Sequence, residues 1–160
     1  MLNAYGWIVI RSSRERYADP ELTIDEMVEV LDDAVRIKDE ALWQQLRGWL
    51  EEKADPDLKW QFTERFNAVS GLLQVTASRN HRASCIWDLM RWIAANGAGS
   101  YGLVYVHDDE DNETNTDYRR GDADNSNAFR VWRIANGMLE ELDDPFLSPI
   151  VPTINPSEYA

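Results

Sequence analysis

Cysteine, histidine, basic charge and long apolar runs are all scarce in this chain of 160 residues. The single cysteine, Cys85, excludes an internal disulfide and gives no evidence of an oxidising compartment. No apolar run approaches the roughly 18 residues that a membrane-spanning helix needs. Met1 leads directly into a strand-like segment and not into a signal peptide. We therefore expect a soluble, cytoplasmic protein.

Basic residues are outnumbered, with 16 Lys and Arg against 29 Asp and Glu and a formal net charge of −13. Nucleic acids and anionic membranes would repel such a chain, so we exclude both as partners, whereas a basic partner is favoured. The acidic residues form two blocks. The block at 15–58 is typical of a solvated helix face, and the denser block at 108–127 lacks helical periodicity, which predicts an exposed acidic loop.

Residues suited to catalysis are few. His81 and Cys85 are four residues apart, the spacing of a nucleophile and base on one helix face, but a lone cysteine is more typical of a small buried apolar group. The chain has no G-x-S-x-G motif, no phosphate-binding glycine loop and no H-E-x-x-H motif. We expect no catalysis and no cofactor.

The acidic loop has the oxygen-rich composition that Ca²⁺ prefers, but its spacing does not fit. An EF-hand beginning at Asp108 would place Glu113 where glycine is needed and Arg119 where a bidentate Glu is needed. One cysteine and two histidines are also too few for a typical zinc site. We therefore predict no metal site. Two interpretations of the loop stay open. It is either a solubilising insertion or a binding surface, on which a cationic partner would relieve the mutual repulsion of the carboxylates.

Hydrophobic periodicity and turn signals predict eight elements in the order β-α-β-β-α-β-β-β. Thr23 and Glu26 form a capping box for the first helix, which runs as one or two helices to the stop at 55–57. Asn136–Gly137 favours a type I′ turn. The expected strands are 4–11, 66–69, 72–77, 103–107, 129–135 and 138–142, and the second helix is 82–96.

These elements predict an α+β fold with a single mostly antiparallel sheet and helices packed on one face. We expect one domain over 1–160, with the acidic loop at 108–127 and an extended Pro-rich tail at 144–160. Apolar residues on both faces of the first strand indicate that it is covered on both sides. Sheet-face packing is expected for four aromatic residues: Tyr5, Trp7, Tyr101 and Tyr105.

Several segments together resemble the immunity protein 7 family of bacterial polymorphic toxin systems. They are the opening Tyr5–Gly6–Trp7, Asn80–His81–Arg82, GSYGLVYVHDDED at 99–111, NAFRV at 127–131 and DPFLSPIVPT at 144–153. Residues 40–66 and 112–126 depart from the family pattern. The resemblance implies a non-catalytic immunity protein of α+β fold that binds and neutralises a cognate toxin.

We expect the acidic loop to bind this toxin, and to mimic phosphates where the toxin is a nuclease. For Asp108 and Asp109, a structural role fits the sequence as well as toxin binding does, since they could pair with His81, Arg79 or Arg82. Alternative functions are immunity to a non-nuclease toxin, a small-molecule- or Ca²⁺-binding regulatory domain and, behind these, an enzyme. The candidate partner-binding residues are Asp108, Asp109, Glu110, Asp111, Glu113, Asp117, Tyr118, Asp122 and Asp124.

Overall fold

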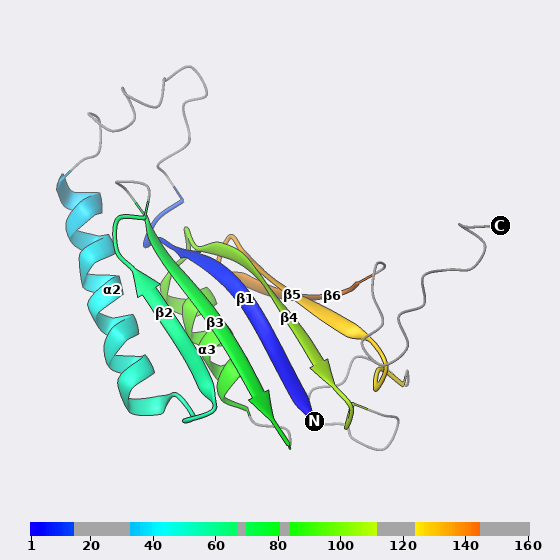
Figure 1. Ribbon diagram of the computed structural model, residues 1–160. Helices are drawn as coiled ribbons and strands as arrows, with labels where there is room; N and C mark the ends of the chain where they lie inside the picture. The colour runs from blue at the N-terminus through cyan, green and yellow to red at the C-terminus, as the bar shows by residue number, and fades with distance from the viewer. Residues whose placement is uncertain (15–32, 67–69, 81–83, 112–123, 145–160) are drawn as a thin grey trace.

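The computed structural model describes residues 1–14, 33–66, 70–80, 84–111 and 124–144. Six strands and two helices lie in these ranges (Figure 1). In chain order they are β1 (Leu2–Ile10), α2 (Asp33–Lys53), β2 (Leu58–Thr63), β3 (Gly71–Arg79), α3 (Cys85–Asn96), β4 (Tyr101–Asp108), β5 (Phe129–Ala135) and β6 (Met138–Asp143).

The strands form one sheet in the order β2-β3-β1-β4-β5-β6, and every neighbouring pair is antiparallel. Figure 1 shows α3 behind the strands and α2 beside β2, with the other face of the sheet toward the viewer. The predicted fold class and the order of elements are confirmed. None of the helices within the described ranges is long and apolar enough to cross a membrane.

The core lies between the sheet and the two helices. Helix α3 buries Ile86, Leu89 and Ile93, which recur at helical spacing and leave the charged residues outside. Helix α2 buries a second apolar stripe, and its Trp43 indole nitrogen donates to the Ile10 carbonyl at 3.2 Å. These contacts hold both helices against the same face of the sheet.

Helix α2 is continuous through its polar middle segment, where the sequence alone did not decide between one helix and two. Asp39 lies in this segment and is buried, and its carboxylate accepts hydrogen bonds from the backbone and the hydroxyl of Ser12 at 2.8 and 2.5 Å. The polar residue therefore ties the helix to the end of β1. The predicted helix start at Thr23 lies outside the described residues.

The second strand lies earlier in the chain than predicted. Phe66 lies in the turn after β2, residues 67–69 are outside the described ranges, and the strand that pairs with β3 is Leu58–Thr63. Its alternation of Leu58, Trp60 and Phe62 is a strand signal. The proximity of this segment to α2 and its tryptophans obscured that signal.

The predicted turn at Asn136–Gly137 is confirmed by left-handed φ angles of 56° and 72° at its two central residues. It joins β5 to β6, where Arg133 pairs with Glu140 across the hairpin. This hairpin extends the sheet beyond β4.

Among the described residues, strand β1 is covered less on one face than predicted. Its helix-facing residues, such as Ile8 and Ile10, are fully buried, whereas Tyr5 and Trp7 on the opposite face are 43% and 42% exposed. The large aromatic rings pack sideways against rings of neighbouring strands and leave their outer surfaces open.

Candidate functional site

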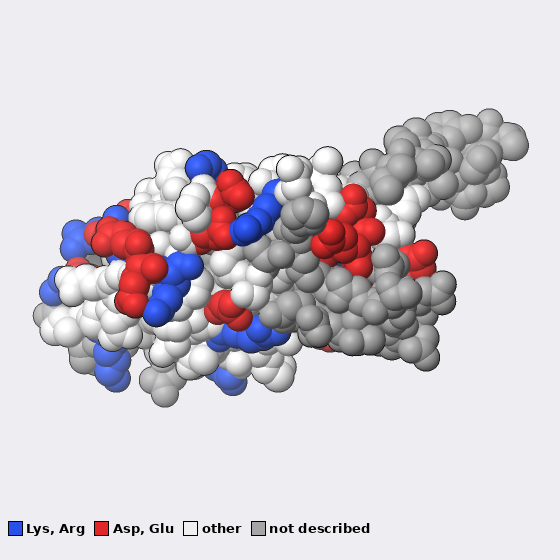
Figure 2. All heavy atoms as spheres, turned by 90° about the horizontal axis from the view of Figure 1, so that it is seen from below, with Lys and Arg blue, Asp and Glu red and all other residues white. Residues whose placement is uncertain are grey.

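The predicted acidic residues that the structure describes gather where β4 ends. Asp108 is the last residue of β4, and Asp124 precedes the turn that leads into β5. We call the set Asp108, Asp109, Glu110, Asp111 and Asp124 the acidic end. Figure 2 shows acidic side chains without Lys or Arg next to them at the right of the view, beside the grey residues, whereas farther left acidic and basic side chains lie side by side.

Two members of the acidic end point into the protein. Asp108 and Asp111 are only 4% and 5% exposed. The Asp108 carboxylate accepts a hydrogen bond from the Glu110 backbone N–H at 3.0 Å, and the Asp111 carbonyl accepts one from the Asn125 backbone N–H at 2.8 Å. These two residues join the end of β4 to the segment before β5.

Three members lie nearer the surface. Asp109 forms an ion pair with the Met1 amino group, and Glu110 is partly exposed. Asp124 is exposed, and its carboxylate accepts a hydrogen bond from the Ser126 backbone N–H at 2.9 Å. Hydrogen bonds from the side chain and backbone of Ser126 lower the pKa of Asp124, so this carboxylate stays charged at neutral pH.

A buried arginine stands beside the two inward-pointing aspartates. Arg130 donates to Glu141 at 2.8 Å and also pairs with Asp143, and these carboxylates raise its pKa despite its burial. Asp108 and Asp111 line the same small cavity, of about 10 Å³, as Arg130 and Glu141. A cavity of this volume holds about one water molecule and no larger ligand.

Sequence reasoning did not single out Arg130 as the charge beside Asp108. The proposed pairing with Arg79 is not what the structure shows, because Arg79 pairs with Asp55 and approaches Asp57 at 3.9 Å. The sequence signal that could have identified Arg130 was strand alternation. On β5 and β6, Arg130 and Glu141 lie on one face of the sheet, and the residues next to them in the sequence lie on the opposite face.

Four of the predicted partner-binding residues lie outside the described ranges: Glu113, Asp117, Tyr118 and Asp122. His81 and Arg82, the other proposed structural partners of Asp108 and Asp109, also lie outside them.

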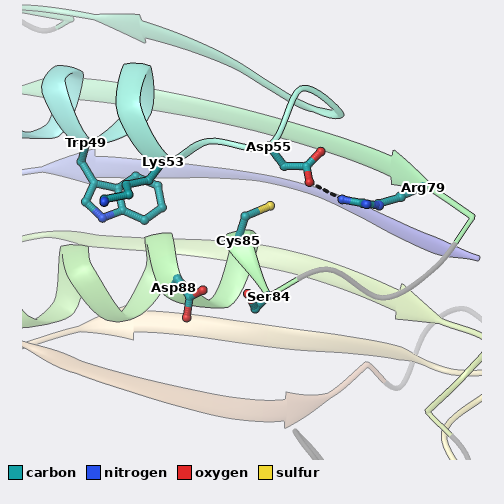
Figure 3. Close-up of a pocket in the computed structure, with 7 residues that line it drawn as sticks. All are labelled: Trp49, Lys53, Asp55, Arg79, Ser84, Cys85 and Asp88. Carbon is teal, nitrogen blue, oxygen red and sulfur yellow. Dashed lines mark hydrogen bonds and ion pairs between the residues drawn. The ribbon is translucent and has the colours of Figure 1, made fainter.

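A pocket of about 540 Å³ lies between the end of α2 and the start of α3 (Figure 3). The Asp55–Arg79 ion pair and Cys85 line it. Burial raises the pKa of the Cys85 thiol above its ordinary value, which favours the protonated thiol at neutral pH. The backbone N–H of Asp57 and then Arg79 lower the pKa of Asp55, so the carboxylate also stays in its charged, paired form.

Within the part of the chain that the structure describes, no three or more His, Cys, Asp or Glu side chains are arranged so that they could hold a metal ion. The geometry at the acidic end supplies surface carboxylates held by a rigid strand end. Such an arrangement suits binding of a cationic surface.

Comparison with known families decides what kind of protein carries this surface. The family model of Immunity protein 7 matches residues 1–156, nearly the whole chain. The chain belongs to the Immunity protein 7 family. A search of curated proteins and a search of solved structures each found no match. Family membership supports a role in immunity within toxin systems, which implies a toxin as the partner, and it suggests a non-catalytic inhibitor.

Proposed function

We propose that this chain neutralises a cognate toxin by binding over its active site through the acidic end. The observation that carries the proposal is the Immunity protein 7 match, which covers both the acidic end and the sheet that supports it. The toxin's active site would be basic, as in a nuclease that binds phosphates, and carboxylates would occupy the positions of those phosphates.

The burial of individual residues refines the expected contacts. Asp109, Glu110 and Asp124 are accessible at the acidic end and supply its described charge. We assign Asp108 and Asp111 to positioning this surface, because a buried carboxylate does not reach a partner without rearrangement of the loop. We propose that the acidic-loop residues outside the described ranges extend the surface: Glu113, Asp117, Tyr118 and Asp122.

Repulsion among the carboxylates supplies the driving force. The chain carries a net charge of −13, and like charges at one end raise the free energy of the unbound protein. A basic toxin surface relieves this repulsion, speeds encounter and fixes the orientation of the complex. Salt screens the attraction, so binding through this end weakens as ionic strength rises.

The test is co-expression with the toxin domain encoded beside this chain's gene. Bacteria that make the toxin domain are expected to grow only when the chain is present. The double variant Asp109→Lys/Asp124→Lys is expected to bind the purified toxin domain at least about tenfold more weakly at low salt, because it replaces attraction with repulsion.

The matched control is Glu51→Lys/Glu52→Lys on α2, which changes the net charge equally at an exposed position away from the acidic end. It is expected to bind within about twofold of the unmodified chain. Equal weakening by both double variants would show a non-specific effect of net charge and would contradict the site. Absence of protection by the unmodified chain would contradict the function itself.

A further inference from the structure

The face of the sheet opposite the helices carries an exposed cluster of aromatic rings. Strand register places Tyr5 directly opposite Tyr105. Trp7 lies two residues further along β1, opposite Leu103, and therefore on the same face. Tyr101 shares the face and is 40% exposed, close to the values for Tyr5 and Trp7. We call Tyr5, Trp7, Tyr101, Tyr105 and Phe129 the aromatic face.

The rings of the aromatic face are held in place by one another. The Tyr5 and Tyr105 rings stack at 5.2 Å with an interplanar angle of 7°, and Phe129 meets Tyr5 edge-on at 6.1 Å. Trp7 meets Tyr101 edge-on at 6.3 Å. Because the strands and these contacts fix the rings before binding, a partner would meet a rigid surface at a small entropic cost.

The β1 and β4 residues at the centre of this face carry no Asp, Glu, Lys or Arg, although the Arg11 guanidinium lies 5.5 Å from the centre of the Tyr101 ring. The residues of β1 that share it are Asn3, Tyr5, Trp7 and Val9, and those of β4 are Tyr101, Leu103, Tyr105 and His107. Protein interfaces have this composition at their centre, enriched in Tyr and Trp and depleted in charge. Trp and Tyr are also the residues that most often carry binding energy there.

Carboxylates border the aromatic face at the acidic end. The Asp144 backbone N–H donates to the Phe129 carbonyl at 3.3 Å, which places Asp144 beside this face, and burial, then Tyr105 and Asp144, raise the pKa of the Tyr5 hydroxyl. His107 connects the two regions, since its ring meets Phe129 at 5.8 Å and its Nε2 lies 3.0 Å from the Ser126 carbonyl.

We propose that the aromatic face is the central contact for the toxin, and that the toxin covers it with an apolar patch edged by Lys or Arg. This inference rests on the proposed function and adds a surface to it. Charge complementarity selects the occupant. Asp144 lies at one border, the Arg133 charge at another border is paired with Glu140, and the net charge of −13 suits a basic protein, whereas a second copy of this chain, also at −13, is repelled. Cations also bind favourably over Tyr rings.

The experiment compares dissociation rates from the toxin domain against which the unmodified chain protects. Tyr5→Thr/Trp7→Thr removes two exposed rings and keeps residues with high strand propensity. Loss of two central aromatic contacts is expected to raise Kd at least about 100-fold, mainly through faster dissociation. The matched control, Ile37→Thr, removes a side chain that is 59% exposed on α2 and is expected to change Kd less than about twofold.

Each outcome decides the inference. Unchanged dissociation of Tyr5→Thr/Trp7→Thr, with protection by the unmodified chain intact, would overturn the aromatic face and leave the immunity function standing. A fall in the denaturation midpoint as large as that of a core substitution would show that the chain itself covers the face and would also overturn it. So would a dimer of the chain alone that the double variant abolishes. Absence of protection by the unmodified chain would remove both proposals.

Discussion

Single residues in the acidic sequence at the end of β4 differ in role according to the side of the backbone on which they lie. Asp108 and Asp111 are buried beside Arg130, whereas Asp109 is exposed and pairs with the Met1 amino group. The run of four acids therefore combines structural carboxylates with surface carboxylates. A composition argument treats the four alike, whereas the turn after β4 separates them: the Asp111 backbone N–H donates to the Asp108 carbonyl, and the Asp111 carbonyl accepts from Asn125.

Replacing Arg130 tests the structural half of this arrangement. Arg130→Met keeps the aliphatic length but removes the buried cation that pairs with Glu141 and Asp143. We expect a loss of about 3 kcal/mol in the free energy of unfolding, as for breaking a buried ion pair. Urea denaturation at pH 7 measures it.

The control is Arg133→Met on the same strand. Its ion pair with Glu140 is half exposed, with side-chain exposures of 52% and 50%, so we expect a loss below about 1 kcal/mol. Equal losses for the two variants would show that burial of Arg130 has no energetic importance.

At the scale of elements, close approach of β3 to α2 depends on a residue without a side chain. A Cβ atom at Gly71 would lie 2.5 Å from the Phe62 ring and 2.9 Å from the Trp43 indole nitrogen. Gly71→Ala must therefore displace two buried aromatic rings, and we expect it to cost about 1–3 kcal/mol in unfolding free energy. Thermal denaturation should show a matching fall in midpoint.

Gly48 provides the opposite case within α2. A Cβ at Gly48 meets nothing within 4 Å, and alanine favours a helix over glycine by about 1 kcal/mol. Gly48→Ala is expected to raise the midpoint that Gly71→Ala lowers. A fall with both substitutions would contradict the explanation from ring displacement.

The elements themselves were largely predictable from local patterns. Apolar spacing in α3 and the Asn136–Gly137 turn signal correspond directly to what the structure shows, because each depends on neighbours in the sequence. The strand at Leu58–Thr63 was missed because its alternation is short and follows a long tryptophan-bearing helix. Local periodicity does not determine which of two adjacent apolar segments pairs with β3.

The candidate site was less predictable, for a physical reason. Carboxylates at the acidic end are visible in composition, but burial of Asp111 depends on Asn125 and Arg130, which approach it only after folding. Exposure of Tyr5 and Trp7 depends on which face the helices cover. Both properties are set by long-range contacts that no window of the sequence contains.

At the scale of the whole molecule, charge and aromatic surface are arranged so that they affect different steps of binding. Long-range attraction acts before contact and governs association, whereas packed aromatic contacts act after contact and govern dissociation. The two surfaces adjoin through His107 and Phe129, so in the proposed complex one approach of the toxin would engage both. The proposed complex thus forms quickly through one surface and lasts through the other.

This division predicts distinct kinetic responses to salt. For the unmodified chain, raising NaCl from about 50 mM to 500 mM should slow association with the toxin domain at least about tenfold and change dissociation less than about threefold, because salt screens only the long-range term. Asp109→Lys/Asp124→Lys should reduce the salt dependence of association, and Tyr5→Thr/Trp7→Thr should leave it intact while dissociation accelerates. Stopped-flow mixing and surface plasmon resonance measure the two rates. If both double variants changed the same rate constant, the two surfaces would act as one patch, and the separation of roles argued from their charge and packing would be wrong.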